Sequence, residues 1–205
     1  MNILHISCSP RGTVSESHRL ALRIIEHLQR AHPRAVRIER ALGRDAPPFI
    51  DGTHATALGA AQTSPSEALG EGTLAVSDML IRELEQADAV VIGTPMHNFS
   101  VPATLKLWID HIVRVRRSFD MGAQGKLGRL RNRPVLVAVS SGGAFSGERA
   151  RQPDFLTPYL RAVLAVIGLR DVSFFTVEGT GGGADAVEQA RARAERALQA
   201  HFDTV

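Results

Sequence analysis

The sequence predicts an α/β fold in which a parallel five-stranded sheet lies between two layers of helices. Short apolar runs alternate with longer segments of helical spacing along all 205 residues, and strands separated by helices form parallel sheets. The run from Ala89 to Ile92 is apolar at every position, which is typical of a strand covered on both faces. We expect one domain, residues 1–205, because this length suits one α/β domain and hardly two.

The first half of the chain predicts three strands and one helix. Residues 2–7 predict the first strand. Residues 17–30 predict a helix, because their apolar residues recur at intervals of three and four positions. The short segment 35–40 and the apolar run 87–94 predict the second and third strands.

A helix and the fourth strand follow. Residues 101–113 predict a helix with Trp108 on its apolar face, and we interpret Trp108 as a packing residue. Pro102 falls in the first turn of this helix, where its missing N–H group costs little. Residues 133–140 are largely apolar and predict the fourth strand.

The last part of the chain predicts one strand between two helices. Thr157 and Pro158 predict the N-cap and the first residue of a helix, and Gly168 predicts its C-terminal stop. Residues 172–179 predict the fifth strand. Residues 184–202 are rich in Ala, Arg and Glu and predict the final helix.

The composition is that of an ordinary globular protein, with 44% hydrophobic and 22% charged residues. The apolar runs are far shorter than the ~20 residues that a membrane helix needs. The N-terminus enters a strand without a signal-peptide pattern, so we expect a cytoplasmic protein. Cys8 is the single cysteine, which excludes an internal disulfide, and we interpret it as a core residue. No metal site is expected.

The net charge of +3 is mildly basic. Its main cluster, formed by Arg114, Arg116 and Arg117, is interpreted as a solvated helix face, because no interleaved aromatic residues or DNA-binding motif accompany it. We therefore expect no nucleic-acid partner. A modest positive field would still favour ligands that carry phosphate.

Residues 41–72 depart from the alternation of strands and helices. They are dense in Ala, Gly, Pro, Thr and Ser, and so long a stretch without periodicity is unusual inside a compact domain. Such a stretch is often a lid or a binding loop. The alternative is a tolerated insertion without a role, and the sequence leaves both interpretations open.

Three polar loops follow the first, third and fourth strands. Ligands of open parallel sheets bind beyond the carboxyl ends of the strands, so these loops should share one edge. The first loop leads into a helix N-terminus, which attracts phosphate through its free N–H groups and positive dipole end. Ser9, Ser15 and Ser17 add hydroxyl groups, although N-capping would also explain Ser15.

The first loop lacks the glycine patterns of nucleoside-triphosphate and dinucleotide sites, so a monophosphate fits it better. Glu39 stands where a ribose-binding acid would, at the end of the second strand. Without those glycines we interpret Glu39 as a solvated strand end.

The second loop begins the stretch TPMHNFSVPATLKLWID, residues 94–110. Between the core strand and the next helix, it carries the rings of His97 and Phe99 and the amide of Asn98. Such a loop is suited to bind a flat heterocycle. The third loop, residues 140–143, can bring bare backbone N–H groups close to a ligand, although Gly-Gly commonly just turns a chain.

Four motifs together resemble a known family. They are S-x-x-x-x-x-S-x-S after the first strand, P-M-x-N-F-x-x-P-x-x-L-K-x-W-I-D after the third, S-S-G-G after the fourth, and T-P-Y-L-x-x-x-L-x-x-I-G later. In order and spacing they are similar to the FMN-dependent NAD(P)H azoreductases, which belong to the flavodoxin-like quinone reductases. The resemblance spans nearly the whole chain. It implies a flavodoxin-like three-layer sandwich with strand order 2-1-3-4-5.

The resemblance also implies one FMN, with its phosphate on the first loop and its isoalloxazine between the second and third loops. The residues that would contact FMN are Ser9, Ser15, Glu16, Ser17, Met96, His97, Asn98, Phe99, Ser140, Ser141, Gly142 and Gly143.

One position departs from the family pattern. Well-known members carry Tyr where this chain has His97, so no stacking or hydroxyl role is carried over to it. We interpret His97 as a ring that shapes the pocket. The alternative is that it donates a proton or a hydrogen bond to the substrate.

The implied reaction passes two electrons from NADH or NADPH through FMN to a quinone or an azo compound by a ping-pong mechanism. The N–H groups of Gly142 and Gly143 would stabilise the negative charge of the reduced flavin, and no obligatory acid–base residue is expected. The alternative is a flavodoxin-type electron carrier without small-substrate turnover. Such carriers tend to be acidic, so the charge of +3 argues against it.

A homodimer with composite active sites is also expected, partly from the resemblance and partly from the surplus of loop and aromatic residues beside the expected flavin edge. Two-fold dimers are also the commonest oligomers. Phe119 is interpreted first as a packing residue, with a contact in the substrate pocket of a partner subunit as the alternative.

Overall fold

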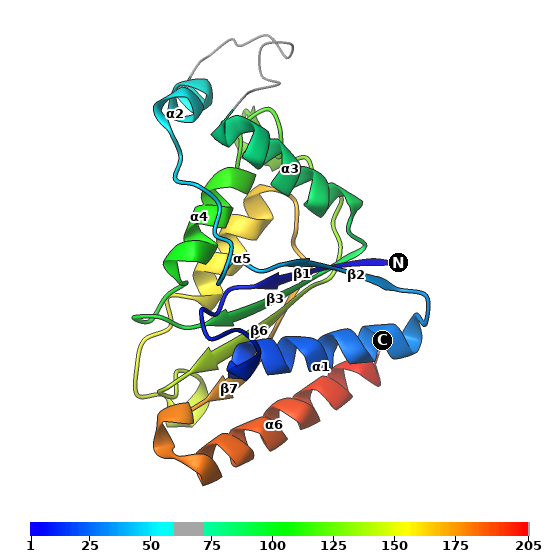
Figure 1. Cartoon of the computed structure of the whole chain (residues 1–205), viewed down its shortest axis with the longest axis vertical. Helices are drawn as coiled ribbons and strands as arrows, with labels where there is room; N and C mark the ends of the chain where they lie inside the picture. The colour runs from blue at the N-terminus through cyan, green and yellow to red at the C-terminus, as the bar shows by residue number, and fades with distance from the viewer. Residues whose placement is uncertain (60–71, 205) are drawn as a thin grey trace.

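The computed structural model describes residues 1–59 and 72–204. Its central sheet has five parallel strands in the order β2-β1-β3-β6-β7 (Figure 1). In chain order the strands are β1 (Asn2–Ser7), β2 (Val36–Arg40), β3 (Ala89–Pro95), β6 (Val135–Ser141) and β7 (Val172–Glu178). Counted along the chain, this is the order 2-1-3-4-5, so the predicted fold class is confirmed.

Helices cover both faces of the sheet (Figure 1). The helices α1 (Glu16–Ala31) and α6 (Ala184–Phe202) cover one face. The other face is covered by α3 (Thr73–Gln86), α4 (Ala103–Ile112) and α5 (Thr157–Val166). The sheet is therefore the middle layer of three, which leaves its carboxyl edge as the place where loops can gather.

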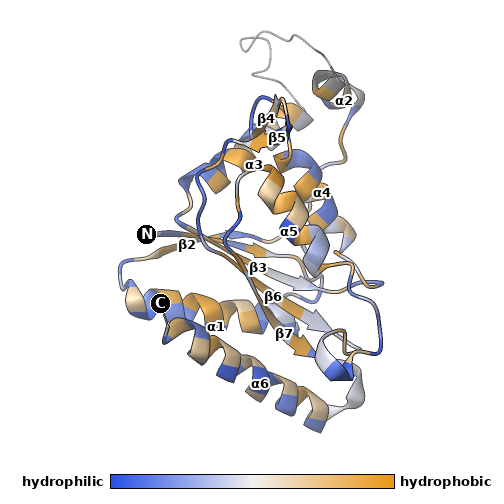
Figure 2. Cartoon of the chain, turned by 180° about the vertical axis from the view of Figure 1, so that it is seen from behind, coloured by the Kyte–Doolittle hydropathy of each residue, from blue (hydrophilic) through white to orange (hydrophobic). Residues whose placement is uncertain are grey.

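Each face of the sheet has its own hydrophobic core. Ile24 of α1 packs with Leu198 of α6 under one face, and Trp108 of α4 packs with Leu80 of α3 on the other. Trp108 and Cys8 are buried, as predicted. Figure 2 shows hydrophobic residues in the sheet and along α1, α3 and α4, and hydrophilic residues repeated along α6. Among the described residues, no helix combines the length and the hydropathy that crossing a membrane requires.

The ends of two helices refine the predicted boundaries. Pro102 is the N-cap of α4 rather than part of its first turn. Thr157 is already helical, and the capping group is the carboxylate of Asp154, which accepts hydrogen bonds from the Thr157 N–H at 2.9 Å and from the Thr157 hydroxyl. Gly168 stops α5 as predicted, with φ of 104° and its N–H bonded to the Ala165 carbonyl at 3.1 Å.

Two elements were not predicted from the sequence, α3 and the antiparallel hairpin of β4 (Phe119–Gly122) and β5 (Gly125–Gly128). The arginine cluster lies between α4 and this hairpin. Arg114 is buried and pairs with Asp78 of α3 at 2.5 Å, and Arg117 pairs with the same carboxylate at 3.2 Å. The interpretation of a solvated helix face is therefore wrong for Arg114, because its charge is neutralised inside the fold.

The segment 41–72 is partly structured. It contains α2 (Gly52–Gly59), while residues 60–71 lie outside the described residues. Before α2, the Pro48 carbonyl accepts a hydrogen bond from Nε2 of His111 at 2.8 Å. The Asp51 carboxylate accepts bonds from the His54 N–H and the Thr73 hydroxyl, each at 2.8 Å. The segment is therefore tied to α4 through Pro48 and to α3 through Asp51, and the lid interpretation stays a prediction.

Candidate active site

The loops after β1, β3 and β6 meet at the carboxyl edge of the sheet and enclose a cavity of about 380 Å³, which is within the range of small-molecule sites. We call it the first cavity. The predicted site residues that line it are Ser9, Ser15, Glu16, Met96, His97, Ser140, Ser141 and Gly142. The structure therefore brings together residues from all three predicted loops.

Four predicted residues belong to the same loops without lining the first cavity. Ser17 is fully buried beneath Ser15, and Gly143 packs against the side chain of Gln152. Asn98 and Phe99 lie at an exposed turn. Their predicted contacts with a cofactor stay predictions.

The first loop ends at the N-terminus of α1. Ser15 is the N-cap but makes no side-chain capping bond. Its hydroxyl instead lies 2.9 Å from the Ser17 hydroxyl. The N–H groups of the first helical turn have no intrahelical acceptor, so they remain able to bind an anion beside the Ser15 hydroxyl.

Glu16 lines the same end of the cavity, yet its charge is balanced. Its carboxylate pairs with the Arg191 guanidinium of α6 and with Nε of Arg19 at 3.2 Å. Hydrogen bonding from Arg191, opposed by burial and helped by Arg19, lowers the pKa of Glu16. The paired carboxylate would repel a phosphate less than a free one would.

The second loop is a tight turn after β3. The His97 N–H donates to the Ser100 carbonyl at 2.9 Å, and the Ser100 N–H donates back at 3.0 Å. The two central residues have positive φ, 47° at Asn98 and 68° at Phe99. This combination defines a type I′-like turn and is uncommon for a bulky residue.

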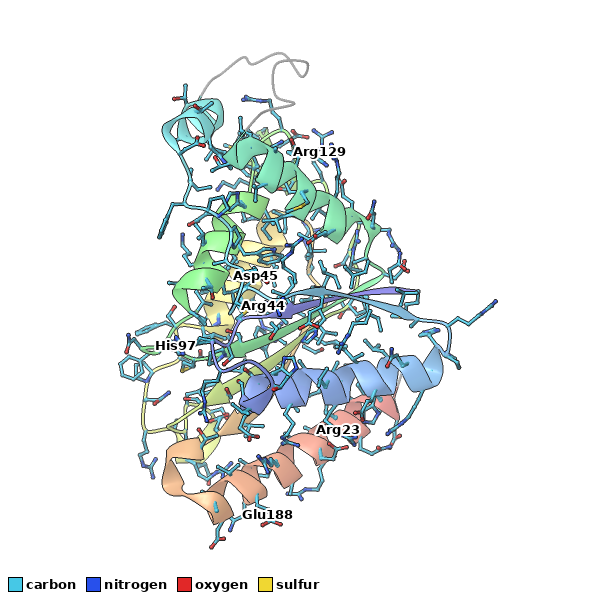
Figure 3. The ribbon with its side chains drawn as sticks, viewed as in Figure 1. Arg23, Arg44, Asp45, His97, Arg129 and Glu188 are labelled. Carbon is cyan, nitrogen blue, oxygen red and sulfur yellow. The ribbon has the colours of Figure 1, made fainter. Side chains whose placement is uncertain are left out.

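The turn is fixed at both ends to the neighbouring loops. The Met96 N–H donates to the Ser140 carbonyl at 2.8 Å, and the Phe155 N–H donates to the Phe99 carbonyl at 3.0 Å. Figure 3 shows His97 at the carboxyl edge of the sheet, with its ring directed away from the strands. The backbone of this loop is thus held rigidly, while the side chain of His97 is exposed.

The third loop is anchored by an amide and a carboxylate from later in the chain. Nε2 of Gln152 donates to the Ser141 hydroxyl at 2.9 Å and lies 3.1 Å from Sδ of Met96, so it joins the second and third loops. A Cβ on Gly143 would lie 2.2 Å from Oε1 of Gln152. Glycine is therefore required there for the amide to sit in this place.

Glu178 at the end of β7 holds the continuation of the third loop. Its carboxylate accepts hydrogen bonds from the N–H groups of Phe145 and Ser146, at 2.8 and 3.1 Å, and from the Ser146 hydroxyl at 2.6 Å. Burial acts to raise the pKa of Glu178, but these bonds, with one from Thr176, outweigh it and lower the pKa.

Comparison with known proteins agrees with this architecture. A family described as having a flavodoxin-like fold matches residues 1–202. An FMN-dependent NADH:quinone oxidoreductase of Pseudomonas fluorescens is 47% identical over 197 residues, covering 96% of this chain and 93% of that protein. One of Burkholderia lata is 47% identical over 204 residues, covering 99% and 98%. The chain belongs to the FMN-dependent NADH:quinone oxidoreductase family.

Solved structures place this oxidoreductase family member in the same fold. An azoreductase from Bacillus anthracis superposes with a TM-score of 0.82 at 21% identity, and each chain covers 99% of the other. A second structure, an FMN-dependent NADH-azoreductase of the same species in complex with FMN, has a TM-score of 0.77 at 22% identity, covering 98% of this chain and 100% of that one. At such identities the likeness concerns the fold.

Several residues at the site of this quinone oxidoreductase family member were not predicted from its sequence. Arg11 lines the first cavity and is exposed, and a charged residue in the first loop was a usable signal. Thr180 also lines the cavity, and its hydroxyl donates to the Ser141 carbonyl at 3.1 Å. Gln152 and Glu178 carry no local pattern, because the loop residues that they hold, Met96, Ser141 and Phe145, lie 11 to 56 residues away in the chain.

Phe119 lies apart from the first cavity of its own chain. It is 6% exposed in β4, and Nζ of Lys126 lies 4.9 Å from the centre of its ring. It lines a separate cavity of about 310 Å³ with Val113 and Met121. Its predicted packing role fits this position.

Proposed function

We propose that the chain is an FMN-dependent oxidoreductase that passes two electrons from NADH to quinones and azo compounds. The observation that carries the proposal is the first cavity, in which a helix N-terminus whose N-cap, Ser15, makes no side-chain capping bond faces the loops after β3 and β6. The names of the relatives with 47% identity support the cofactor, the donor and the quinone acceptor. The azo acceptor rests on the azoreductases that share the fold.

The residues of the first cavity fit FMN in two respects. The first turn of α1 offers N–H groups, with the Ser9 and Ser15 hydroxyls and the Arg11 guanidinium beside them, for a phosphate dianion. At the other end, the space next to Gly142 is open, since a Cβ there would meet no atom within 4 Å. A flat ring could therefore approach this backbone closely.

When bound, FMN supplies the chemistry of accepting a hydride from the nicotinamide and of giving two electrons to the acceptor. The protein orients the reactants. The backbone of Met96 and His97 would support one edge of the ring, and the N–H groups of Gly142 and Gly143 would stabilise negative charge at its pyrimidine side. His97 is exposed beside this position and would shape the acceptor pocket.

The test is steady-state kinetics on the purified protein with its FMN, with NADH or NADPH as donor and a quinone or an azo dye as acceptor. We expect FMN to copurify, NADH to drive quinone reduction without a partner protein, and parallel lines in double-reciprocal plots. A protein that binds no FMN, or that reduces no small acceptor, would contradict the proposal.

A flavodoxin-type electron carrier is the rival. The net charge of +3 disfavours it, because such carriers dock to basic partners through acidic surfaces. The two functions separate in one assay. A carrier would be reduced by a reductase protein and would show no turnover with NADH and a quinone alone.

We also propose a homodimer whose active sites are completed by the partner subunit. Phe99 and Phe155 are 43% and 59% exposed beside the first cavity and are joined by the backbone hydrogen bond described above. Exposed rings next to a site favour an interface there. Phe119 would then stand at the substrate pocket of the partner. Sedimentation that finds only an active monomer at micromolar concentration would contradict the dimer.

A further inference from the structure

A second cavity, of about 400 Å³, adjoins the first. The two cavities share Ser9, Pro10 and Arg11 as a common wall. The far side of the second cavity is formed by Glu39 at the end of β2 and by Arg44 just after it. A ligand whose phosphate lies at the first loop could therefore extend around Arg11 into this space.

The second cavity is built by a close approach of two chain segments. Leu42 is fully buried, and the next residue, Gly43, donates its N–H to the Ser7 carbonyl at 3.1 Å. A Cβ on Gly43 would lie 2.1 Å from the Ser9 carbonyl oxygen, so every residue other than glycine would clash with this oxygen. The segment after β2 is thereby fixed against the first loop and forms a defined wall.

The charged groups around the second cavity suit a nucleotide. Arg11 and Arg44 line it from opposite segments, and guanidinium groups bind phosphate well. Arg44 lies 2.8 Å from the neighbouring Asp45 carboxylate and stays 81% exposed. Figure 3 labels Arg44 and Asp45 on the segment that follows β2, on the same side of the molecule as His97.

Glu39 and His18 supply groups for the sugar and the base. The Glu39 side chain is 37% exposed, with Arg37 at 3.6 Å. A carboxylate at the end of the second strand of an α/β sheet is placed to accept hydrogen bonds from ribose hydroxyls. Nδ1 of His18 is occupied by the Ser7 hydroxyl at 3.0 Å, which leaves its other ring nitrogen for a ligand. The volume is that of a small-molecule site, larger than a lone phosphate needs.

We propose that the second cavity is a subsite for an adenosine phosphate group. The inference rests on the proposed function, because that function brings nucleotides to this edge of the sheet. Two sources offer the same chemistry. One is the adenosine diphosphate portion of the NADH donor, and the other is the adenosine portion of FAD bound in place of FMN.

The primary test is calorimetric titration of ADP into the FMN-loaded protein. We expect saturable binding that weakens by roughly tenfold in the double variant Glu39→Gln/Arg44→Ala, which removes one carboxylate and one exposed guanidinium contact. Arg34→Ala is the matched control, because Arg34 is exposed in the turn before β2, at the opposite edge of the sheet. It should leave ADP binding unchanged.

Two further measurements identify the source. If the donor uses the subsite, the double variant raises KM for NADH by roughly tenfold and leaves KM for reduced nicotinamide mononucleotide unchanged. If the cofactor uses it, the double variant weakens binding of FAD to the apoprotein and leaves binding of FMN unchanged.

The proposal is overturned if ADP does not bind, or if ADP binds equally well to the double variant. It is also overturned if the double variant changes neither the KM for NADH nor the affinity of the apoprotein for FAD. FMN retention and quinone turnover are measured on the same samples. They can persist when ADP binding fails, so failure of the subsite is distinct from failure of the proposed function.

Discussion

Glu178 and Ser146 are joined by two hydrogen bonds, from the serine hydroxyl at 2.6 Å and from its backbone N–H at 3.1 Å. This pairing fixes the loop that follows β6 to the end of β7. Glu178 as a whole is 9% exposed, so little water can reach its carboxylate to replace these donors.

Replacing Glu178 by Gln should lower the free energy of unfolding by about 1–3 kcal/mol near neutral pH, because an amide nitrogen would face N–H donors. The folded pKa of Glu178 is lowered, so its stabilisation is complete above the unfolded value of about 4.3 and is lost as the pH falls through the folded value. The difference between wild type and variant should therefore shrink in acid. Urea denaturation from about pH 7 to about pH 3 measures it.

Glu188→Gln is the control for this series, because Glu188 is exposed on α6 (Figure 3). It should leave stability nearly unchanged at every pH. An effect of Glu178→Gln that grows as the pH falls would refute the account of the carboxylate as an anionic acceptor.

Changing Ser15 and Ser17 together to Ala should weaken FMN binding by roughly tenfold or more, since one charge-assisted hydrogen bond contributes ~1.5–3 kcal/mol. Fluorescence titration of the apoprotein with FMN measures the affinity, and circular dichroism checks the fold. Ser17→Ala alone is the matched control, because Ser17 does not line the first cavity. FMN affinity that is unchanged in the double variant would rule out this phosphate site.

Gly43→Ala should disturb the first loop. Its new methyl group would lie 2.1 Å from the Ser9 carbonyl oxygen, and such overpacking costs about 1–3 kcal/mol. For a chain of this size that corresponds to a fall in Tm of roughly 2–12 °C, together with weaker FMN binding. Gly52→Ala is the control, because a Cβ there meets no atom within 4 Å. Equal melting temperatures for the two variants would show that the close approach is not rigid.

His97→Tyr and His97→Phe separate two roles of the exposed ring. If His97 only shapes the pocket, both variants should alter acceptor preference and leave reduction of the flavin by NADH nearly intact. A loss of about 100-fold or more in the acceptor half-reaction of His97→Phe would instead indicate proton donation. Rapid-mixing kinetics distinguish the half-reactions. His32→Tyr, at the far end of α1, is the control, and unchanged kinetics of both His97 variants with every acceptor would place the ring outside the pocket.

Sequence patterns predicted the parts of the fold that depend on local periodicity. The apolar run of β3 and the turn at Gly168 are examples. Burial on both faces selects apolar residues along β3, and positive φ selects glycine at position 168. The helix α3 also has a recognisable pattern, with Leu80, Ile81 and Leu84 buried. It was not singled out because it follows the compositionally biased stretch without a recognisable N-cap, and Gly72 occupies that position.

The contacts that organise the site were beyond local patterns. Gln152 reaches Met96 across 56 residues of chain, a pairing that only the folded sheet creates. Asn98 and Phe99 form their turn without the Asn-Gly signal that predicts it. The second cavity depends on how closely Gly43 approaches Ser9, and no spacing rule encodes that distance.

The bond between Asp51 and Thr73 has a consequence for engineering. These residues are 22 positions apart in the chain. Their hydrogen bond holds the two ends of the intervening segment together at the N-terminus of α3. The entropic cost of a longer excursion rises slowly, by only ~0.6 kcal/mol for each doubling of its length. A peptide tag or a reporter domain spliced between them would leave the register of the sheet untouched, because the junction itself keeps its geometry.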